Sequence, residues 1–522
     1  MAGPVIAACR LALGPAATRC AARRAVARVR SLSTAGPIFT STFPDVDMPN
    51  VPLSEYVLGH VDRHDPSAPA LVDGASGRAL SYGELRPTVE AFAAGLHHAC
   101  ELRHGDVLAI LLPNCPEYFV AFQAAASRGI VLTTLNPLYT PEEVGAQLSD
   151  SKAKYILTVG ALVGPAREAA ALAGGGVRGL ITLDDSGAEA GELRALTYTS
   201  VMAAGSDAAA RAALPPVSVS PSDLLVLPYS SGTSGRSKGV KLTHRNVLAN
   251  LLQIDPLLVL SPKDTVLGLL PFFHIYGMVV VLKACITHGC KIVTMPKFDP
   301  ELFLKLIAEC NFTVMHLAPP LVQFLAKHPA VEAVLPQLRA SLREIVSGAA
   351  PLGEELAHAA KERLSCPLVR QGYGMTEMSP VSHLSPPHGL PDEKLGAAGM
   401  LLPSMSAKIV GEGGELLGVG ETGELVMKGP NVMQGYLELP EATAECLDDD
   451  GWLRTGDIGY VDADGYYFVN DRVKELIKTK GFQACRREMR APRAFCRCET
   501  GLPGVNHRHG SPHTNAGGAR RA

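Results

Sequence analysis

Residues 229–240 read Tyr229-Ser230-Ser231-Gly232-Thr233-Ser234-Gly235-Arg236-Ser237-Lys238-Gly239-Val240. This short stretch combines hydroxyl side chains, glycines and one lysine. Because glycine has no Cβ, its backbone N–H groups can approach an anion, while the hydroxyls add donors and the lysine adds positive charge. The apolar run Leu224–Leu227 before it predicts a buried strand. The stretch therefore predicts a phosphate-binding loop at the carboxyl end of a sheet, where α/β proteins bind ligands.

The same stretch has two alternative interpretations. Runs of serine and glycine are most often surface turns. A P-loop requires Gly-Lys-Ser/Thr, whereas Lys238 follows Ser237 and precedes Gly239, so the spacing excludes that motif. Every position of Ser230–Lys238 instead resembles the phosphate-binding signature of the adenylate-forming superfamily, which includes acyl-CoA synthetases, 4-coumarate:CoA ligases and firefly luciferase.

Length and composition indicate how many domains to expect and argue against a nucleic-acid-binding protein and a membrane-spanning one. The 522 residues exceed the usual limit for one hydrophobic core, so two or more domains are expected. A net charge of −3 argues against a nucleic-acid partner. No apolar run reaches the roughly 18–20 residues of a membrane span, and Lys283 interrupts the apolar stretch Gly277–Ile286.

The amino-terminal segment differs in composition from the rest of the chain. Residues 1–44 contain no acidic side chain, while arginines recur among alanines and are followed by Ser31-Leu32-Ser33-Thr34. This composition is typical of a mitochondrial transit peptide, here predicted over residues 1–35. A disordered basic arm and a plastid or other organellar address remain alternatives.

Predicted strands and helices alternate through the first half of the chain. Gly105–Pro113 reads as a buried strand and Pro116–Ser127 as a helix, and a second helix begins at Thr243–Asn246. Such alternation predicts an α/β fold with parallel sheet and flanking helices. In the alanine- and glycine-rich segment Ala161–Pro216 we expect helices and loose connections at the surface.

Later segments resemble further superfamily motifs, in the family order and at near-family spacing: Pro271–Gly277, Met295–Phe298, Ser347–Gly353, Gln371–Glu377, Trp452–Gly459 and Asp471–Gln483. Taken alone, a histidine within an aromatic run is usually a packed core residue, and an isolated lysine is usually a solvated one. The resemblance implies a large domain over residues 51–470, built of layered sheets flanked by helices, and a hinge over residues 471–483.

A dinucleotide-binding fingerprint is formally present at Gly418–Gly423. The fingerprint must open a helix, but the residues that follow, Glu424–Gly429, read as a strand. We therefore predict a turn between two strands, within a β-rich subdomain near Lys408–Gly435.

The resemblance also implies roles for single residues. For nucleotide binding these are Ser230, Ser231, Gly232, Thr233, Ser234, Gly235, Ala349, Gln371, Gly372, Tyr373, Thr376, Asp457, Arg472, Lys474, Lys478 and Gln483. For catalysis they are Lys238, His274, Thr376 and Glu377, with Glu377 also the ligand of Mg²⁺. For the acyl group they are His274, Tyr276, Gly348 and Gly372, and for CoA they are Lys297, Lys480 and Gly481. The chemistry is consistent, because Mg²⁺ prefers carboxylate and phosphate oxygens.

The resemblance ends at Gln483. Members of the superfamily continue into a small α/β domain with a lysine used in adenylation, whereas residues 484–522 contain no lysine, aspartate or isoleucine. A segment of this composition cannot bury a domain core. We expect a divergent, disordered tail in place of the small domain and, as a result, weakened catalysis.

The sequence as a whole is most similar to that of an acyl-CoA synthetase related to 4-coumarate:CoA ligases. The implied reaction converts a fatty or hydroxycinnamic acid, ATP and CoA to an acyl-CoA through an acyl-adenylate. One alternative is a truncated, non-catalytic protein that binds nucleotide or acyl groups. Oxygenation of the acyl-adenylate, as in luciferase, is a weaker third possibility.

Overall fold

The computed structural model describes residues 38–184, 193–230, 237–472, 476–479 and 482–485. Contacts divide the chain into two compact units, 1–470 and 471–522. In the second unit, β24 (Leu476–Thr479) pairs with β25 (Phe482–Cys485) in antiparallel register. The predicted transit peptide and most of the predicted tail lie outside the described residues.

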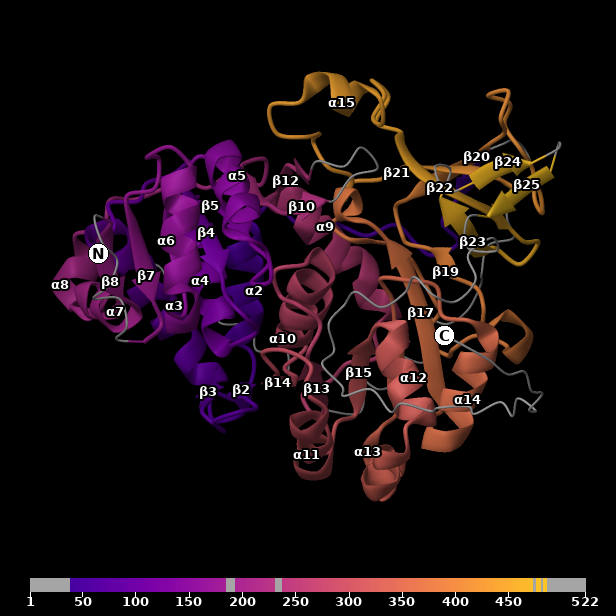
Figure 1. Cartoon of the computed structure of the whole chain (residues 1–522), viewed down its shortest axis with the longest axis horizontal. Coiled ribbons are helices and arrows are strands. Elements are labelled where there is room, and N and C mark those ends of the chain that lie inside the picture. Colours follow the sequence, from indigo (N-terminus) through magenta and orange to yellow (C-terminus); the bar gives the residue numbers. More distant parts are fainter. Residues whose placement is uncertain (1–37, 185–192, 231–236, 473–475, 480–481, 486–522) are drawn as a thin grey trace, which may run out of the picture. The chain divides into compact units, whose positions relative to one another are not determined.

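A seven-stranded sheet forms the amino-terminal part of the first unit (Figure 1, indigo to magenta). Its order is β12 (Leu242–Thr243), β9 (Leu224–Leu227), β5 (Val131–Thr134), β4 (Val107–Leu111), β6 (Ala153–Thr158), β7 (Gly179–Thr182) and β8 (Arg194–Thr197). From β9 to β8 all neighbours are parallel, and β12 is antiparallel to β9. This arrangement confirms the predicted parallel α/β architecture.

Helices cover both faces of this sheet, as the alternation of buried side chains along β4 requires. Val107, Ala109 and Leu111 pack with α5 (Pro141–Ser151) and α6 (Val163–Leu172). The alternate residues Leu108 and Ile110 join the core formed with α3 (Tyr82–His98), α4 (Pro116–Ser127) and α7 (Tyr198–Ser206). A short helix, α8 (Ala208–Ala212), follows α7.

The expectation for Ala161–Pro216 was partly wrong. The helices are present, but the segment also contains β7 and β8, which extend the parallel sheet. All four residues of β7 are buried. A four-residue strand with both faces covered has no polar alternation, so the sequence carries little sign of it.

A second sheet of fourteen strands runs through the rest of the first unit. Its order is β1 (Ile38–Thr40), β20 (Ser406–Val410), β21 (Gly423–Lys428), β22 (Leu453–Val461), β23 (Tyr466–Arg472), β19 (Gly399–Leu401), β18 (Val381–Leu384), β17 (Leu368–Gly374), β16 (Glu344–Ser347), β15 (Val314–Leu317), β13 (Thr265–Gly268), β14 (Lys291–Thr294), β2 (Pro69–Asp73) and β3 (Ala79–Ser81). Strands β17 to β2 are parallel. Antiparallel pairing joins β20 to β21 and β21 to β22, which confirms the predicted β-rich region.

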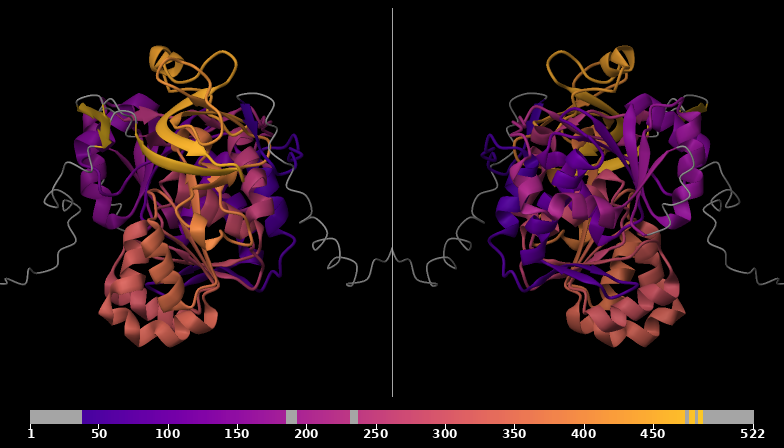
Figure 2. Two further views of the ribbon diagram at one scale, coloured as in Figure 1. Left: turned by 90° about the vertical axis from the view of Figure 1, so that its right-hand side faces the viewer. Right: turned by 90° about the vertical axis from the view of Figure 1, so that its left-hand side faces the viewer.

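The parallel strands of the second sheet also have helices on both faces. One face carries α11 (Pro300–Cys310), α12 (Pro319–Lys327), α13 (Leu335–Ser341) and α14 (Glu354–Leu364). Figure 2 shows these helices gathered on one side of the strands. The other face shares a core with α2 (Leu53–Val61), α9 (His244–Ile254), the π-helix η4 (Gly277–Ala284) and α10 (Cys285–Thr287). The other helices among the described residues are α15 (Pro440–Ala444), η1 (Gly160–Leu162), η3 (Asp255–Leu257), η5 (Pro329–Val334), η6 (Thr376–Met378) and η7 (Asp392–Lys394).

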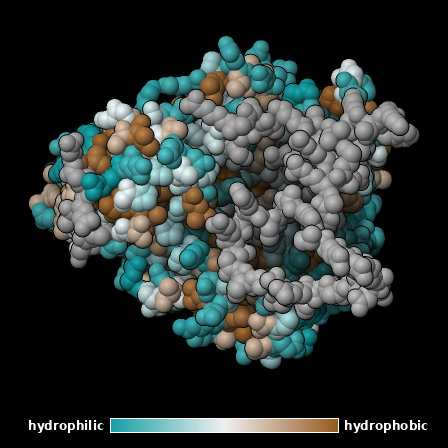
Figure 3. Space-filling model, in the orientation of Figure 1, coloured by the Kyte–Doolittle hydropathy of each residue, from teal (hydrophilic) through white to brown (hydrophobic). Residues whose placement is uncertain are grey.

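The described surface shows hydrophobic side chains scattered among hydrophilic ones (Figure 3). Within the described residues, no helix combines the length and the apolar character needed to cross a bilayer. Lys283, which interrupts the apolar stretch in the sequence, is itself completely buried in η4.

Candidate functional site

Many of the predicted site residues follow the carboxyl ends of parallel strands. Tyr229 and Ser230 follow β9, His274 and Tyr276 follow β13, Lys297 follows β14, Gly348 and Ala349 follow β16, and Gln371–Gly374 closes β17. Parallel strands present their carboxyl ends at one edge of a sheet, which is the expected place for a ligand in an α/β protein. Here two sheets contribute: Ser230 follows β9 of the seven-stranded sheet, Glu377 follows β17 of the fourteen-stranded sheet, and a hydrogen bond joins their side chains.

A two-stranded hairpin holds the two ends of the predicted phosphate loop. Strand β10 (Tyr229–Ser230) pairs with β11 (Lys238–Gly239), and Ser230 lies opposite Lys238. The loop residues Ser231, Gly232, Thr233, Ser234 and Gly235 lie outside the described residues. The hairpin therefore places the hydroxyl of Ser230 and the ammonium of Lys238 side by side at the base of the loop.

Glu377 lies beside this hairpin. Its Oε1 accepts hydrogen bonds from Ser230 Oγ and from Tyr436 Oη, each at 2.9 Å. The residue is only 4% exposed and belongs to η6, together with the buried Thr376. The structure thus brings together the serine, lysine, threonine and carboxylate that the resemblance assigned to phosphate and metal.

Tyr436 is a member of this cluster that the sequence reasoning missed. Besides its bond to Glu377, its ring centroid lies 4.8 Å from Lys238 Nζ. The segment around it pairs with the residues that follow the loop, through an antiparallel bridge between Val240 and Tyr436. No sequence signal we used pointed to it, because its partners are distant along the chain.

Buried amides hold the turn that carries Glu377. In α9, Asn246 Nδ2 donates to the carbonyl of Val432 at 2.9 Å, and Asn250 Nδ2 donates to that of Val381 at 2.7 Å. Asn431 Nδ2 donates to the carbonyl of Met378 at 2.8 Å. The two α9 amides are four residues apart and so share one face of the helix, a spacing that could have indicated this role from the sequence.

A second group of predicted residues meets across β17 and β22. Tyr373 Oη donates to Asp457 Oδ2 at 2.6 Å, and Asp457 is buried. Gln371 fastens the neighbouring loop, since its Oε1 accepts from the N–H of Leu352 at 2.9 Å and its Nε2 donates to the carbonyl of Leu352 at 3.1 Å. The side chain of Gln371 therefore supports the loop that contains Gly348 and Ala349.

That loop has an unusual backbone. Ala349 adopts a φ of 70°, in the left-handed region that residues with a Cβ rarely occupy. At Gly348, a Cβ would lie 2.7 Å from Cε1 of Tyr276, so only glycine lets the tyrosine ring pack here. Strained residues of this kind concentrate at ligand sites. Gly372 has more room, because its nearest neighbour, Leu384 Cδ1, would lie 3.3 Å from an added Cβ.

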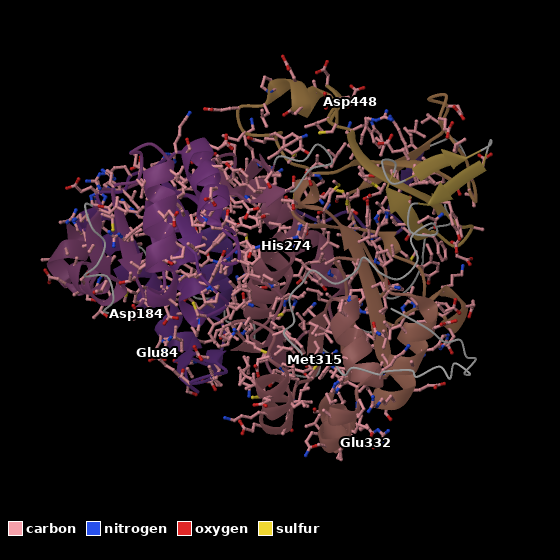
Figure 4. The ribbon with its side chains drawn as sticks, in the orientation of Figure 1. Glu84, Asp184, His274, Met315, Glu332 and Asp448 are labelled. Atoms are coloured by element: carbon pink, nitrogen blue, oxygen red, sulfur yellow. The ribbon has the colours of Figure 1, made fainter. Side chains whose placement is uncertain are left out.

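The two aromatic-run residues differ in their surroundings. Tyr276 is partly buried, and its Oη lies 3.2 Å from Nδ1 of His316, a buried histidine that we had not predicted. Burial lowers the pKa of His316 to about 3, so the ring is neutral at pH 7. His274 is exposed and lies between the helices of the first sheet and β17 in the view of Figure 4. Its Nδ1 accepts the N–H of Tyr276 at 3.3 Å.

The remaining predicted residues are only partly described. Lys297 is exposed after β14. Of three residues only the backbone is described: Arg472 ends β23, and Lys478 lies opposite Gln483 in the β24–β25 hairpin. Lys474, Lys480 and Gly481 lie outside the described residues.

The residues present suit a magnesium–phosphate ligand. Glu377 supplies a hard carboxylate oxygen whose orientation is held by two hydroxyl donors, and Lys238 supplies a nearby positive charge. Mg²⁺ is usually held by one or two carboxylates together with substrate phosphates and water, so a single carboxylate is sufficient. In the part of the chain with described side chains, no group of three or more His, Cys, Asp or Glu residues forms an all-protein metal site.

Comparisons with known proteins also indicate a site for a nucleotide. The family described as AMP-binding enzyme matches residues 59–437. A probable 4-coumarate–CoA ligase 1 of Dictyostelium discoideum is 40% identical over 484 residues, which cover 89% of this chain and 85% of that protein. The 4-coumarate–CoA ligase 2 of Oryza sativa subsp. japonica is 40% identical over 461 residues, 85% of this chain and 79% of that protein.

Solved structures of related enzymes have a fold similar to that of this chain. ATP-bound MatB from Rhodopseudomonas palustris is 30% identical with a TM-score of 0.71, covering 84% of this chain and 82% of that chain. A long-chain-fatty-acid–CoA ligase from Archaeoglobus fulgidus is 25% identical with a TM-score of 0.71, covering 85% of this chain and 87% of that chain.

Proposed function

Because this chain belongs to the AMP-binding enzyme family and is an AMP-forming acid–CoA ligase, we propose that it activates a fatty or hydroxycinnamic acid at the site built around Ser230, Lys238 and Glu377. The acid carboxylate attacks the α-phosphorus of ATP, which forms an acyl-adenylate and releases pyrophosphate. The thiol of CoA then attacks the acyl carbon, which forms the thioester and releases AMP and a proton.

The observation that carries this proposal is the cluster at the phosphate loop. Ser230 and Lys238 face each other across the hairpin that closes the loop, and Ser230 donates to Glu377. A hydroxyl, an ammonium and a carboxylate in one place can bind a triphosphate together with a divalent cation. Such an arrangement has no evident purpose in a site for an uncharged ligand.

In the proposed adenylation step, the chain's own residues hold and neutralise the triphosphate. Lys238 and the loop hydroxyls contact phosphate oxygens, and Glu377 holds Mg²⁺. When bound, Mg²⁺ neutralises negative charge that develops on the phosphates. Charges fixed in advance stabilise the transition state without reorganisation, which is usually the largest contribution to such catalysis.

The other contacts are proposed from the same resemblance. Asp457 accepts the ribose hydroxyls, with Tyr373 and Ala349 beside the adenine, and Tyr276 and Gly348 border the acyl group. The hydrogen bond from Tyr373 to Asp457 and the close packing of Tyr276 on Gly348 support this grouping. Lys297, Lys480 and Gly481 are proposed to contact CoA.

The test is acid-dependent exchange of pyrophosphate into ATP, measured across a panel of aliphatic and hydroxycinnamic acids. Lys238→Ala is expected to lower the exchange rate by roughly 10- to 100-fold, because one phosphate-binding charge is lost. The acid giving the fastest exchange with the unmodified protein identifies the substrate class.

A matched control is Lys327→Ala, which removes an exposed lysine on α12. Equal exchange by both lysine variants would contradict the role of Lys238. Nucleotide binding without exchange for any acid would instead indicate a protein that binds its ligands but does not react them.

We also propose a mitochondrial location, which the acid-free, arginine-rich composition of residues 1–35 supports. Fused to a fluorescent protein, these residues are expected to direct it to mitochondria, and replacement of Arg23, Arg24 and Arg28 by glutamine is expected to abolish import. Diffuse or plastid fluorescence from the unmodified fusion would contradict the proposal.

A further inference from the structure

Tyr436 contacts two groups that the proposed mechanism uses separately. Its hydroxyl donates to Glu377 Oε1 at 2.9 Å, and the face of its ring lies 4.8 Å from the ammonium nitrogen of Lys238. The residue is 8% exposed, so both contacts are largely shielded from water. A single side chain therefore joins the lysine of the phosphate loop to the carboxylate proposed for the metal.

The backbone around Tyr436 is anchored on two sides. Residues 434–437 run antiparallel to residues 239–241, with hydrogen bonds from Lys241 N–H to the carbonyl of Gly435 at 3.0 Å and from Leu437 N–H to the carbonyl of Gly239 at 2.8 Å. On the other side, the N–H of Tyr436 donates to Thr443 Oγ1 at 2.9 Å. Because Lys238 immediately precedes this paired segment, the tyrosine and the lysine are held at a constant spacing.

The hydroxyl bond also orients the carboxylate of Glu377. Both described hydroxyl donors, Ser230 and Tyr436, bond to Oε1. Two donors on one oxygen restrict rotation of the carboxylate and leave Oε2 without a hydrogen bond from these hydroxyls. Hydrogen bonds to an ionised group are stronger than neutral ones, so this restriction is effective.

We propose that Tyr436 is a positioning residue that sets the spacing between the ammonium of Lys238 and the carboxylate of Glu377, so that a metal–triphosphate complex meets both at once. This inference rests on the proposed function. It goes beyond that function in assigning the site's preference for metal-bound over metal-free nucleotide to a residue outside the motifs that the resemblance assigned to nucleotide, acid and CoA.

Two substitutions separate the two contacts of the tyrosine. Tyr436→Phe keeps the ring and its contact with Lys238 but removes the hydroxyl bond, whereas Tyr436→Leu removes both. Tyr460→Phe is a matched control, because Tyr460 lies on β22 and stacks on Phe468 with ring centroids 4.9 Å apart. Unfolding midpoints of all variants show whether the fold is kept.

Binding is measured without turnover, using α,β-methylene-ATP. Electron paramagnetic resonance of Mn²⁺ reports the metal–nucleotide complex, and calorimetry in the presence of a chelator reports the metal-free nucleotide. For Tyr436→Phe, we expect affinity for the metal complex to fall roughly 10- to 100-fold, as for loss of one hydrogen bond to a charged group. Metal-free affinity should change by less than about 2-fold, and Tyr436→Leu should weaken both.

A double-mutant cycle tests whether the effect acts through the carboxylate. In a Glu377→Gln background, Tyr436→Phe is expected to change Mn²⁺–nucleotide affinity by less than about 2-fold, since the group it positions is no longer charged. A purely structural role would give the same loss in both backgrounds.

The outcomes are distinguishable. If the unmodified protein binds the metal complex and Tyr436→Phe binds it equally well, the inference about Tyr436 is overturned and the proposed function stands. Equal weakening of metal-bound and metal-free nucleotide also overturns the inference. If the unmodified protein binds neither form, the proposed function itself fails.

Discussion

Replacing Glu377 by glutamine is expected to lower acid-dependent pyrophosphate exchange by roughly 100- to 1,000-fold, the usual effect of losing one preorganised electrostatic group in an active site. The substitution keeps the size of the side chain and an oxygen that can accept from Ser230 and Tyr436. It removes the negative charge that holds Mg²⁺ beside the triphosphate. The exchange rate should be measured over a range of Mg²⁺ concentrations at saturating acid and ATP.

The metal dependence distinguishes a lost metal ligand from a damaged fold. High Mg²⁺ should recover part of the activity of Glu377→Gln, whereas an unfolded variant would not respond. Glu441→Gln serves as a control, since Glu441 is exposed in the first turn of α15. An exchange rate for Glu377→Gln within about 2-fold of the unmodified protein would show that this carboxylate carries no such role.

Elements with strong local signals could be predicted from the sequence. Proline at the first position and a continuous apolar face marked α4, and the helix spans Pro116–Ser127 as predicted. Thr243 and Asn246 form a capping box, with Asn246 N–H donating to Thr243 Oγ1 at 3.1 Å, and α9 begins where they indicate. In both cases the information lies within a few residues of the boundary.

Features that depend on distant contacts could not be predicted. Strand β7 is short and covered on both faces, so its sequence lacks alternation. Tyr436 lies 59 residues from Glu377 along the chain, and their hydrogen bond follows from pairing between two separate segments. The motif resemblance identified Glu377 but gave no reason to connect it with a tyrosine outside the motif.

Lys283 is a third feature that the sequence did not reveal. An interrupting lysine usually marks an exposed position, yet this side chain is 0% exposed within η4. Its Nζ donates to the carbonyl of Met278 at 3.2 Å and lies 3.3 Å from the ring centroid of Phe122. Burial in these surroundings holds the pKa of Lys283 well below the ordinary lysine value.

Lys283→Met is therefore expected to stabilise the protein at pH 7, by on the order of 1–4 kcal/mol, because the unmodified chain must lose the proton of Lys283 when it folds, at about 1.4 kcal/mol for each unit by which the folded pKa lies below pH 7. Methionine is unbranched and can occupy the path of the lysine stem. The folding equilibrium changes about 10-fold for each 1.4 kcal/mol. Urea unfolding midpoints of the two proteins at pH 7 measure the difference.

The pH dependence provides the sharper test. Below the ordinary lysine pKa of about 10.4, the unfolded chain binds a proton at Lys283 that the folded chain excludes. The contribution of this residue to stability therefore rises with pH, by up to about 1.4 kcal/mol per unit, between its lowered folded pKa and that value. Lys283→Met lacks this dependence, so its gain in stability over the unmodified protein should be largest near pH 7 and shrink toward pH 10.

Lys305→Met, at an exposed position of α11, is the control and should show no such trend. A constant difference between Lys283→Met and the unmodified protein across this range would mean that Lys283 keeps its proton when the chain folds.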